Sequence, residues 1–329
     1  MTERTRTISA VRTLPRERDA AGFSTTDHRI DVPVNPDLVF DALSDVTRWP
    51  LLLPPTVHAE RLSGNDRRER IRIVATANES VKSWESLRTI DTGHRSITFR
   101  QTRSAPPVAF MDGRWVVDSN GAGGSVVILE HRFGATGPEH EQWLHETVDR
   151  NSRTELRALR EALSDAAGNV VVEFSDSVVV HGNRRAVFDF VNDADRWPER
   201  LPHVAEVDFE TVADGVQNLA MITRSPDGTT HRTQSYRVVL KDQSIVYKQF
   251  TLPPLMRRHL GRWTFVDDGD TTVATSHHAV VIDDSRIADQ LGAAATVADA
   301  KAKVVAALSA NSRATLELAK EYAERSRQP

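Results

Sequence analysis

The sequence predicts an α+β fold that is built as two tandem copies of one domain. Three observations predict it: a set of short motifs occurs twice in the same order, each copy contains a run of short strands, and each copy ends in a long amphipathic helix. A chain of 329 residues is long for a single core and suits two domains. We expect a mobile tail at 1–22, a first domain at 23–165 and a second at 170–329.

The duplication is carried by six landmarks. Their positions are 39–41 and 187–189 (Val-Phe-Asp), 48–50 and 196–198 (Arg-Trp-Pro), 86–88 and 235–237 (Ser-x-Arg), 106–107 and 253–254 (Pro-Pro), 113–115 and 261–263 (Gly-Arg-Trp), and 151–153 and 311–313 (Asn-Ser-Arg). The first five pairs lie 147 to 149 residues apart and the last pair 160. Solenoid repeats run roughly 20 to 50 residues, so this period indicates a duplicated domain.

Each element of the first copy has a local signal. A strand-like segment at 23–32 precedes a short helix at 35–46, where Asn35 is a suitable N-cap and is followed by a proline. A Trp-Pro segment then breaks regular structure, and six short strands separated by turn residues extend to Phe133. Apolar residues spaced three and four apart predict a helix at 139–164.

The second copy follows the same plan, with a strand at 170–180, a short helix at 184–193, strands over 204–282 and a final helix at 287–325. Connections this short predict an antiparallel meander. The terminal helix is the element long enough to cover one face of such a sheet. If the sheet curls around the helix, the space between them can hold a ligand.

Composition excludes several classes of function. A net charge of -4 argues against a broad nucleic-acid surface. The chain has no Cys, which excludes disulfides, thiolate metal sites and a Cys nucleophile and favours a reducing cytoplasm. No apolar run approaches the roughly 20 residues of a membrane span, and the Arg-rich start lacks the apolar core of a signal peptide. We therefore expect a cytoplasmic protein that binds neither nucleic acid nor membrane.

The Ser-x-Arg pairs are the candidate chemical groups. Side chains two positions apart share one face of a strand, so Ser86 lies with Arg88, and Ser235 with Arg237. Arginine stays protonated and cannot act as a base, but it can bind a ketone oxygen and stabilise the enolate that develops there. The residues around Arg88 on its side are a mixed set, so an exposed position for this side chain stays open.

Several of these features together resemble a known family. The Trp-Pro segment after the short helix, the Trp-x-Ser-x-Arg strand at 84–88, a Pro-rich loop and the later Trp are similar to those of aromatase/cyclases of bacterial type II polyketide synthases, which belong to the START-like polyketide cyclase/dehydrase and lipid-transport superfamily. The resemblance covers 23–322 and implies two helix-grip domains. Each would be a curved antiparallel sheet of about seven strands wrapped on a long C-terminal helix, with an internal cavity.

The resemblance also implies an activity. The implied reaction is the closure of the first ring of a poly-β-ketone, its dehydration (aromatisation), or both, in a pattern that joins carbons seven and twelve. Neither cofactor nor metal is implied. The implied partners are an acyl carrier protein with a phosphopantetheine-linked polyketide and other polyketide synthase subunits. A carrier of lipid or aromatic ligands without catalysis is the alternative, since the same cavity can simply hold a ligand.

The substrate that the resemblance implies is thus a carrier-bound poly-β-ketone, whose first ring is closed by a bond between carbons seven and twelve, loses water to become aromatic, or both. An enzyme of this kind needs no cofactor, because protons between two ketones are already acidic and the protein contributes mainly folding geometry and oxyanion stabilisation.

Roles for individual residues follow from the resemblance. The expected catalytic residues are Ser86, Arg88, Ser235 and Arg237, and the expected substrate contacts are Thr56, Trp84, Met111, Trp115, His203, Thr233, Met256 and Trp263. Thr233 stands where the first copy has Trp84, and neither copy keeps the tyrosine that one-domain members carry after Trp-Pro. Water loss then needs another proton donor, for which a serine, a bound water, His203 or His231 are candidates.

Some motifs have simpler interpretations. Trp115 and Trp263 suit a core as well as a ligand contact, and the tryptophans of the Trp-Pro segments suit packing of the short helices. The basic run 257–259 suits a solvated face better than a contact with an acidic carrier protein. His277 and His278 are adjacent on a predicted strand and point in opposite directions, which is unsuited to a shared metal site.

Overall fold

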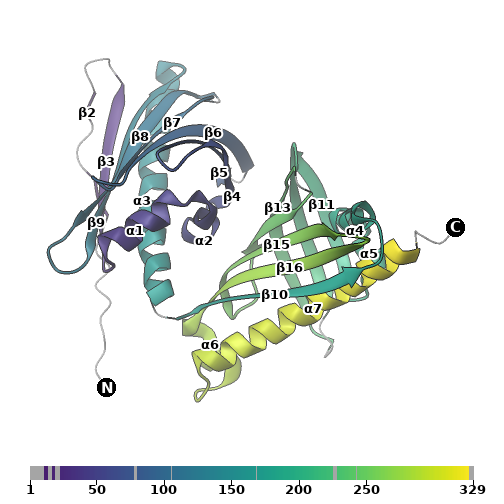
Figure 1. The fold of residues 1–329 in the computed structure, drawn as a ribbon. Helices are drawn as coiled ribbons and strands as arrows, with labels where there is room; N and C mark the ends of the chain where they lie inside the picture. Colours follow the sequence, from purple (N-terminus) through teal and green to yellow (C-terminus); the bar gives the residue numbers. More distant parts are fainter. Residues whose placement is uncertain are drawn as a thin grey trace. The chain divides into compact units, whose positions relative to one another are not determined.

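The computed structural model describes residues 11–13, 17–18, 23–77, 80–104, 106–167, 169–224, 228–241 and 243–325. The chain divides into two compact units, residues 1–167 and 168–329. Each unit contains one antiparallel sheet and one long helix (Figure 1). Among the helices in these ranges, none has the length and apolar character needed to cross a bilayer.

The first unit is an antiparallel meander whose first strand pairs with its last. The main strands are β3 (Ser24–Val32), β4 (Thr56–Gly64), β5 (Arg68–Ala77), β6 (Ser80–Asp91), β7 (Ser96–Gln101), β8 (Val108–Ser119) and β9 (Ser125–Ala135). They are ordered β3-β9-β8-β7-β6-β5-β4 across the sheet. Helix α1 (Pro36–Ser44) follows β3, and the Asn35 side chain accepts a hydrogen bond from the Asp37 amide at 2.8 Å, as the sequence predicts.

The long helix α3 (Glu141–Ala167) packs on β3 and β9 and defines the inner face of the first sheet. Alternation along β3 shows the two faces, because His28 and Ile30 are buried whereas Arg29 and Asp31 are exposed. The core holds Leu156 and Leu159 of α3 together with residues of α1 and of the inner face. Helix α1 and the one-turn helix α2 (Trp49–Leu52) lie in front of α3 in Figure 1, within the curve of the sheet.

Part of the N-terminal segment belongs to the first sheet. Strands β1 (Arg12–Thr13) and β2 (Glu17–Arg18) both pair with β3. Val11 is buried in the first core, and the Thr13 hydroxyl donates to Asp149 of α3 at 3.4 Å. These described residues are therefore held on the sheet and are not the free tail that the composition suggested. The rest of the expected tail lies outside the described residues.

The second unit repeats this architecture with seven strands. They are β10 (Val171–Val180), β11 (Val204–Ala213), β12 (Val216–Arg224), β13 (Thr230–Val239), β14 (Ile245–Thr251), β15 (Met256–Asp268) and β16 (Thr271–Ile282). Their order is β10-β16-β15-β14-β13-β12-β11. The short helices are α4 (Arg184–Asn192) and α5 (Trp197–Arg200). The α+β fold and the two-domain duplication that the sequence predicts are confirmed.

The final helix differs from the prediction of one continuous helix at 287–325. It is divided into α6 (Ile287–Leu291) and α7 (Val297–Arg325). Gly292 has φ +96°, a left-handed conformation that ends α6. A capping box then starts α7, since the Thr296 amide donates to the Asp299 carboxylate at 2.8 Å and the Asp299 amide donates to the Thr296 hydroxyl at 3.3 Å. Helix α7 lies along β10 and β16 (Figure 1).

Candidate functional site

One row of inner-face positions crosses each sheet at the level of the Ser-x-Arg arginine. Strand register defines the rows. The first row is Thr26, His131, Gly113, Phe99, Arg88 and Glu69. The second row is Phe174, His278, Gly261, Tyr247, Arg237 and Gln217. The two rows therefore differ in chemistry at Thr26/Phe174, Phe99/Tyr247 and Glu69/Gln217, and agree at the arginine, the glycine and the histidine.

Arg88 points inward and is 1% exposed, so the open question about its face is settled. Its Nη2 donates to the carbonyl oxygens of Leu43 at 3.0 Å and Ser44 at 3.2 Å, at the C-terminal end of α1. Its guanidinium also lies 5.1 Å from the ring centroid of Trp49. A cation at a helix C-terminus and over an aromatic face is stabilised by both. Burial lowers the pKa of Arg88 to about 10, so the group is still protonated at neutral pH.

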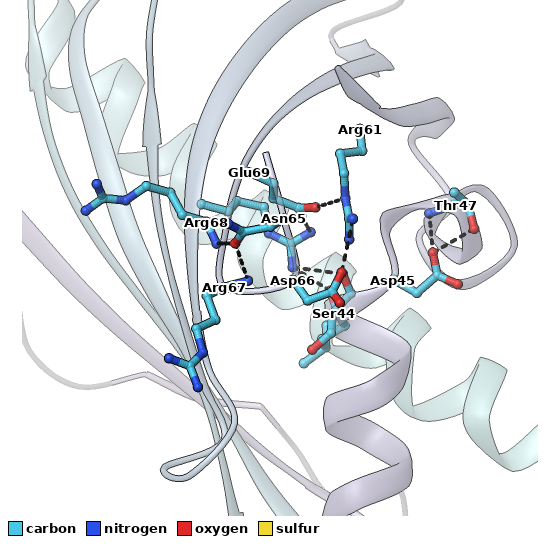
Figure 2. A network of polar contacts seen from close by, with 11 residues as sticks. Ser44, Asp45, Thr47, Arg61, Asn65, Asp66, Arg67, Arg68 and Glu69 are labelled. Atoms are coloured by element: carbon cyan, nitrogen blue, oxygen red, sulfur yellow. Dashed lines mark hydrogen bonds and ion pairs between the residues drawn. The ribbon is translucent and has the colours of Figure 1, made fainter. Parts of the chain in front are cut away.

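A carboxylate neutralises Arg88 within the first unit. Glu69, on the neighbouring strand β5, is 2% exposed and places Oε1 3.1 Å from Nη1 of Arg88. Glu69 also accepts from Nε of Arg61 at 2.6 Å, and Arg61 contacts Asp66 at 3.1 Å. Figure 2 shows this network, with Arg61 reaching between Glu69 and Asp66. The guanidinium of Arg88 is thus the buried end of a charge network that reaches the surface at Arg61 and Asp66.

Arg237 repeats the helix contacts without the carboxylate. It is 1% exposed, its Nη2 donates to the carbonyl of Val191 at 2.7 Å, and it lies 5.3 Å from the ring centroid of Trp197. Gln217 occupies the position of Glu69 and donates to the Asn192 side chain at 3.2 Å. No carboxylate pairs with Arg237 among the described residues, and burial lowers its pKa to about 10. The second unit therefore keeps a buried cation that the first unit neutralises.

The glycine of each Gly-Arg-Trp motif makes room for an aromatic ring. A Cβ on Gly113 would lie 2.4 Å from Cζ of Phe99, and a Cβ on Gly261 would lie 2.0 Å from Cζ of Tyr247. Any side chain here would displace the ring from the inner face. The motif thus fixes where Phe99 and Tyr247 lie, next to the arginine of the adjacent strand.

A histidine on the last strand links each row to the long helix. Nδ1 of His131 lies 3.4 Å from the hydroxyl of Ser152, and Nε2 of His278 lies 2.7 Å from the hydroxyl of Ser312. The two serines are those of the Asn-Ser-Arg motifs, so the structure explains this repeat. Burial lowers the pKa of His131 to about 3 and that of His278 to about 4, so both imidazoles are neutral at pH 7.

The second unit has an additional histidine in contact with the first. His259 is 1% exposed, and its Nε2 lies 2.9 Å from Nδ1 of His278. Its Nδ1 lies 2.6 Å from Oε1 of Gln249. The basic run at 257–259 is therefore not a solvated face, because His259 points inward and Arg258 is 8% exposed. This expectation was wrong because strand alternation turns His259 toward the core.

The predicted site residues occupy three environments. Ser86, Ser235 and Thr233 are buried on the inner face beside the arginines, and Trp84 and Met111 are half-buried there. Trp115 and Trp263 are buried members of the two cores. Thr56 and Met256 are buried at the starts of β4 and β15. His203 is half-buried in the turn before β11, and His231 is exposed.

The tryptophans of the Trp-Pro segments have the packing role that the sequence suggested. The indole Nε1 of Trp49 donates to the carbonyl of Leu43 at 3.1 Å, and that of Trp197 donates to the carbonyl of Phe190 at 3.4 Å. Each indole therefore binds the end of its short helix and at the same time supports the arginine. His277 and His278 point in opposite directions as expected, since His277 is exposed and His278 is buried.

Several polar groups of the site were missed at the level of sequence. They are Glu69, His131, Glu155, Tyr247, His259 and His278. The duplication held the signal for the two row histidines, since His131 and His278 are 147 residues apart, like the Pro-Pro pair. His259 stands 148 residues after Met111, so it, and not Met256, is the counterpart of that methionine. Burial raises the pKa of Glu155, on α3 one turn after Ser152, to about 7.

A hollow of about 1140 Å³ opens on the first sheet, mostly among outward-facing residues. Its lining includes the outward ion pairs Arg114–Glu130 at 2.9 Å and Arg132–Asp112 at 2.8 Å. The row residues Thr26, Arg88, Phe99, Gly113 and His131 also line it, and no residue of α3 does. It is therefore not the hollow expected between sheet and helix. On the inner face, four side chains are only half-buried. These are Trp84, Phe99, Gln101 and Met111.

Comparisons with known proteins place both units in one family. The family model described as polyketide cyclase / dehydrase and lipid transport matches residues 24–164, and a second model of the same description matches 182–295. Two relatives are similar over most of their length. The bifunctional cyclase/dehydratase of the granaticin polyketide synthase of Streptomyces virginiae is 42% identical over 88% of this chain and 96% of its own. That of the actinorhodin polyketide synthase of Streptomyces coelicolor is 39% identical over 84% and 90%.

Two solved structures have the same two-domain architecture. The di-domain ARO/CYC BexL from the BE-7585A biosynthetic pathway superimposes with a TM-score of 0.88 at 42% identity, covering 93% of this chain and 99% of its own. The di-domain ARO/CYC StfQ from the steffimycin pathway gives a TM-score of 0.81 at 30% identity, covering 91% and 98%. The resemblance inferred from the motifs is confirmed, and this chain belongs to the polyketide cyclase/dehydrase and lipid-transport family, in its two-domain form.

Proposed function

We propose that this protein is an aromatase/cyclase that closes the first ring of a carrier-bound poly-β-ketone and removes water from it, joining carbons seven and twelve. The relatives named as bifunctional cyclase/dehydratases and as di-domain ARO/CYC proteins support this reaction class. The observation that carries the proposal is the pair of buried guanidinium groups, Arg88 and Arg237, at matching inner-face positions.

The guanidinium groups suit oxyanion stabilisation. Each uses Nη2 for helix carbonyls, and neither Nε has a partner among the described residues. A protonated donor held in place before the reaction costs no reorganisation when charge develops on a ketone oxygen. In the low-polarity interior, this stabilisation is stronger than in water. Ser86 and Ser235, two residues earlier on the same face, are proposed to bind a neighbouring ketone or its bound water.

Trp84, Met111 and Thr233 are proposed to contact the apolar parts of the folded ketide, because they lie on the inner face next to the arginines. Trp115 and Trp263 would shape the site from the core, and the same holds for Thr56 and Met256 at its border. His203 is proposed to lie at the entrance. The proposed partners are an acyl carrier protein that presents the chain through phosphopantetheine and the other synthase subunits, in the cytoplasm.

The test compares Arg88→Gln and Arg237→Gln with the outer-face control Arg114→Gln. The substrate is the octaketide or decaketide formed in place by the minimal synthase on its carrier protein, and products are resolved by liquid chromatography and mass spectrometry. Loss of one such donor typically lowers the rate about 100- to 1000-fold, so at least one inner-face variant should shift products to spontaneously cyclised compounds.

Melting temperatures of all three variants accompany the assay, because both arginines also bind helix ends. Normal products from both inner-face variants would remove the oxyanion role. Retention of the ketide without faster ring closure or water loss by the wild-type protein would instead identify a carrier.

A further inference from the structure

We propose that the second domain performs the proton transfer of the dehydration step, with Tyr247 as proton donor and His278 and His259 as the relay that restores its proton. This inference rests on the proposed function and assigns the division of labour between its two domains. It is carried by a chain of contacts in the second unit that has no equivalent in the first.

The contacts form a continuous path. The hydroxyl of Tyr247 lies 3.4 Å from Nδ1 of His278, and the same nitrogen lies 2.9 Å from Nε2 of His259. Nδ1 of His259 lies 2.6 Å from Oε1 of Gln249. A distance of 3.4 Å is long for a hydrogen bond, and catalytic contacts commonly tighten only when the substrate binds.

One arrangement of protons satisfies the whole path with both imidazoles neutral. His259 donates through Nδ1 to Gln249 and accepts at Nε2 from the Nδ1–H of His278. His278 in turn accepts at Nε2 from the hydroxyl of Ser312, at 2.7 Å, with Ser276 also within 3.0 Å. Each ring therefore carries one proton and has one lone pair engaged. Such a pair can pass a proton in either direction without a charged intermediate persisting in the core.

Arg237 makes Tyr247 usable as an acid. The two side chains are cross-strand neighbours on the inner face, and Arg237 has no carboxylate partner among the described residues. When Tyr247 gives up its proton, the phenolate forms beside this guanidinium and is stabilised by it. Burial otherwise raises the pKa of Tyr247, which keeps its proton in place until a substrate hydroxyl accepts it.

The first unit has the same positions without this chemistry. Phe99 replaces Tyr247, and Met111 replaces His259. Arg88 is paired with Glu69 at 3.1 Å, so its charge is already neutralised. His131 and Ser152 remain, which shows that the histidine-serine contact by itself is a shared feature of both folds. The relay is therefore specific to the second unit.

The step balances as follows. The O–H bond of Tyr247 breaks and its proton joins the leaving hydroxyl of a β-hydroxy ketone, whose C–O bond breaks to release water. The C–H bond beside the ketone breaks, and its electron pair becomes the new C=C bond. That proton passes to the His278–His259 pair, and Nδ1–H of His278 returns a proton to the phenolate, so the pair ends with the protons it started with. The enzyme ends in its starting state, and no oxidant, reductant or cofactor is consumed.

The chain supplies conservative variants for the test. Tyr247→Phe and His259→Met introduce the residues found at the matching positions of the first unit, so both are compatible with the fold. His277→Gln is the control, because His277 is on the same strand as His278 but lies on the exposed outer face, bonded to Ser175 and Thr264. The probe is a synthetic pantetheine thioester of a monocyclic β-hydroxy ketone, and the readouts are the rate of water loss and its pH profile.

Tyr247→Phe should lower the rate of water loss about 100-fold or more, the range of general acid catalysis, and should remove the alkaline limb of the pH profile. His259→Met should lower it less, and His277→Gln should leave it unchanged. The binding of the probe should be unaffected in all three, which a structural defect would not allow. A wild-type protein that does not dehydrate the probe overturns the proposed function together with this inference. An active wild type with an equally active Tyr247→Phe overturns this inference alone.

Discussion

The tight fit of Gly261 against Tyr247 yields a prediction with a size that follows from the structure. In Gly261→Ala, the new Cβ would lie 2.0 Å from Cζ and 2.2 Å from the hydroxyl of Tyr247. Ordinary contact starts at 3.4 Å, so the ring must move by about 1.4 Å, the difference between 3.4 and 2.0. The atoms in the way belong to one side chain, so the ring moves while the strand stays in place.

Two effects are expected. Overpacking of this kind costs about 1–3 kcal/mol of stability, which corresponds to a fall in melting temperature of about 2–4 °C per kcal/mol for a domain of this size. The shift also takes the hydroxyl out of reach of His278, and misplacement by about 1 Å can cost about 100-fold in rate. Calorimetry and the dehydration assay measure the two effects.

A double-mutant cycle isolates the contact. Tyr247→Ala removes the ring, so the cost of Gly261→Ala should largely vanish in the double variant, with a coupling energy of about 1–3 kcal/mol. Gly93→Ala is the control, because its Cβ would meet nothing closer than 3.5 Å. Additive effects of the two substitutions would refute the reasoning, since they would mean that Gly261 and Tyr247 do not compete for the same space.

Three further predictions concern other groups of the two units. Glu69→Gln gives the first unit the amide of the second and should destabilise it by about 3 kcal/mol or more, because Arg88 loses its buried partner; equal unfolding midpoints in urea would contradict this. Glu155→Gln should flatten the pH dependence of stability between pH 4.5 and about 7. Because the pKa of Glu155 is raised in the folded protein, the folded protein binds more protons than the unfolded chain in this range, and wild-type stability falls as the pH rises through it. Melting curves recorded at a series of pH values measure this change. Thr296→Ala should cost about 1 kcal/mol through loss of the α7 cap, whereas the exposed Thr92→Ala should cost nothing measurable in the same melts.

The local features of this protein followed from its sequence. Asn35 with its proline predicted the start of α1, alternation predicted the strands, and apolar spacing predicted α3, because each of these signals acts over a few residues. The duplication could be recognised for the same reason, since matched motifs need no knowledge of what they contact. The break between α6 and α7 also had a local signal, Gly292 and the Thr-x-x-Asp cap, which the apolar pattern obscured.

The composition of the site was decided by tertiary structure. Ser86 and Arg88 could be assigned to one face of a strand, but the inward direction depends on where the long helix packs. The partners of the arginines come from α1, α4 and β5, and His278 meets His259 only through the pairing of β15 with β16. Such contacts join residues far apart in the chain, and strand register sets them. Sequence therefore determined which side chains each strand presents together, and the pairing of the strands with one another and with the long helix decided which of them meet.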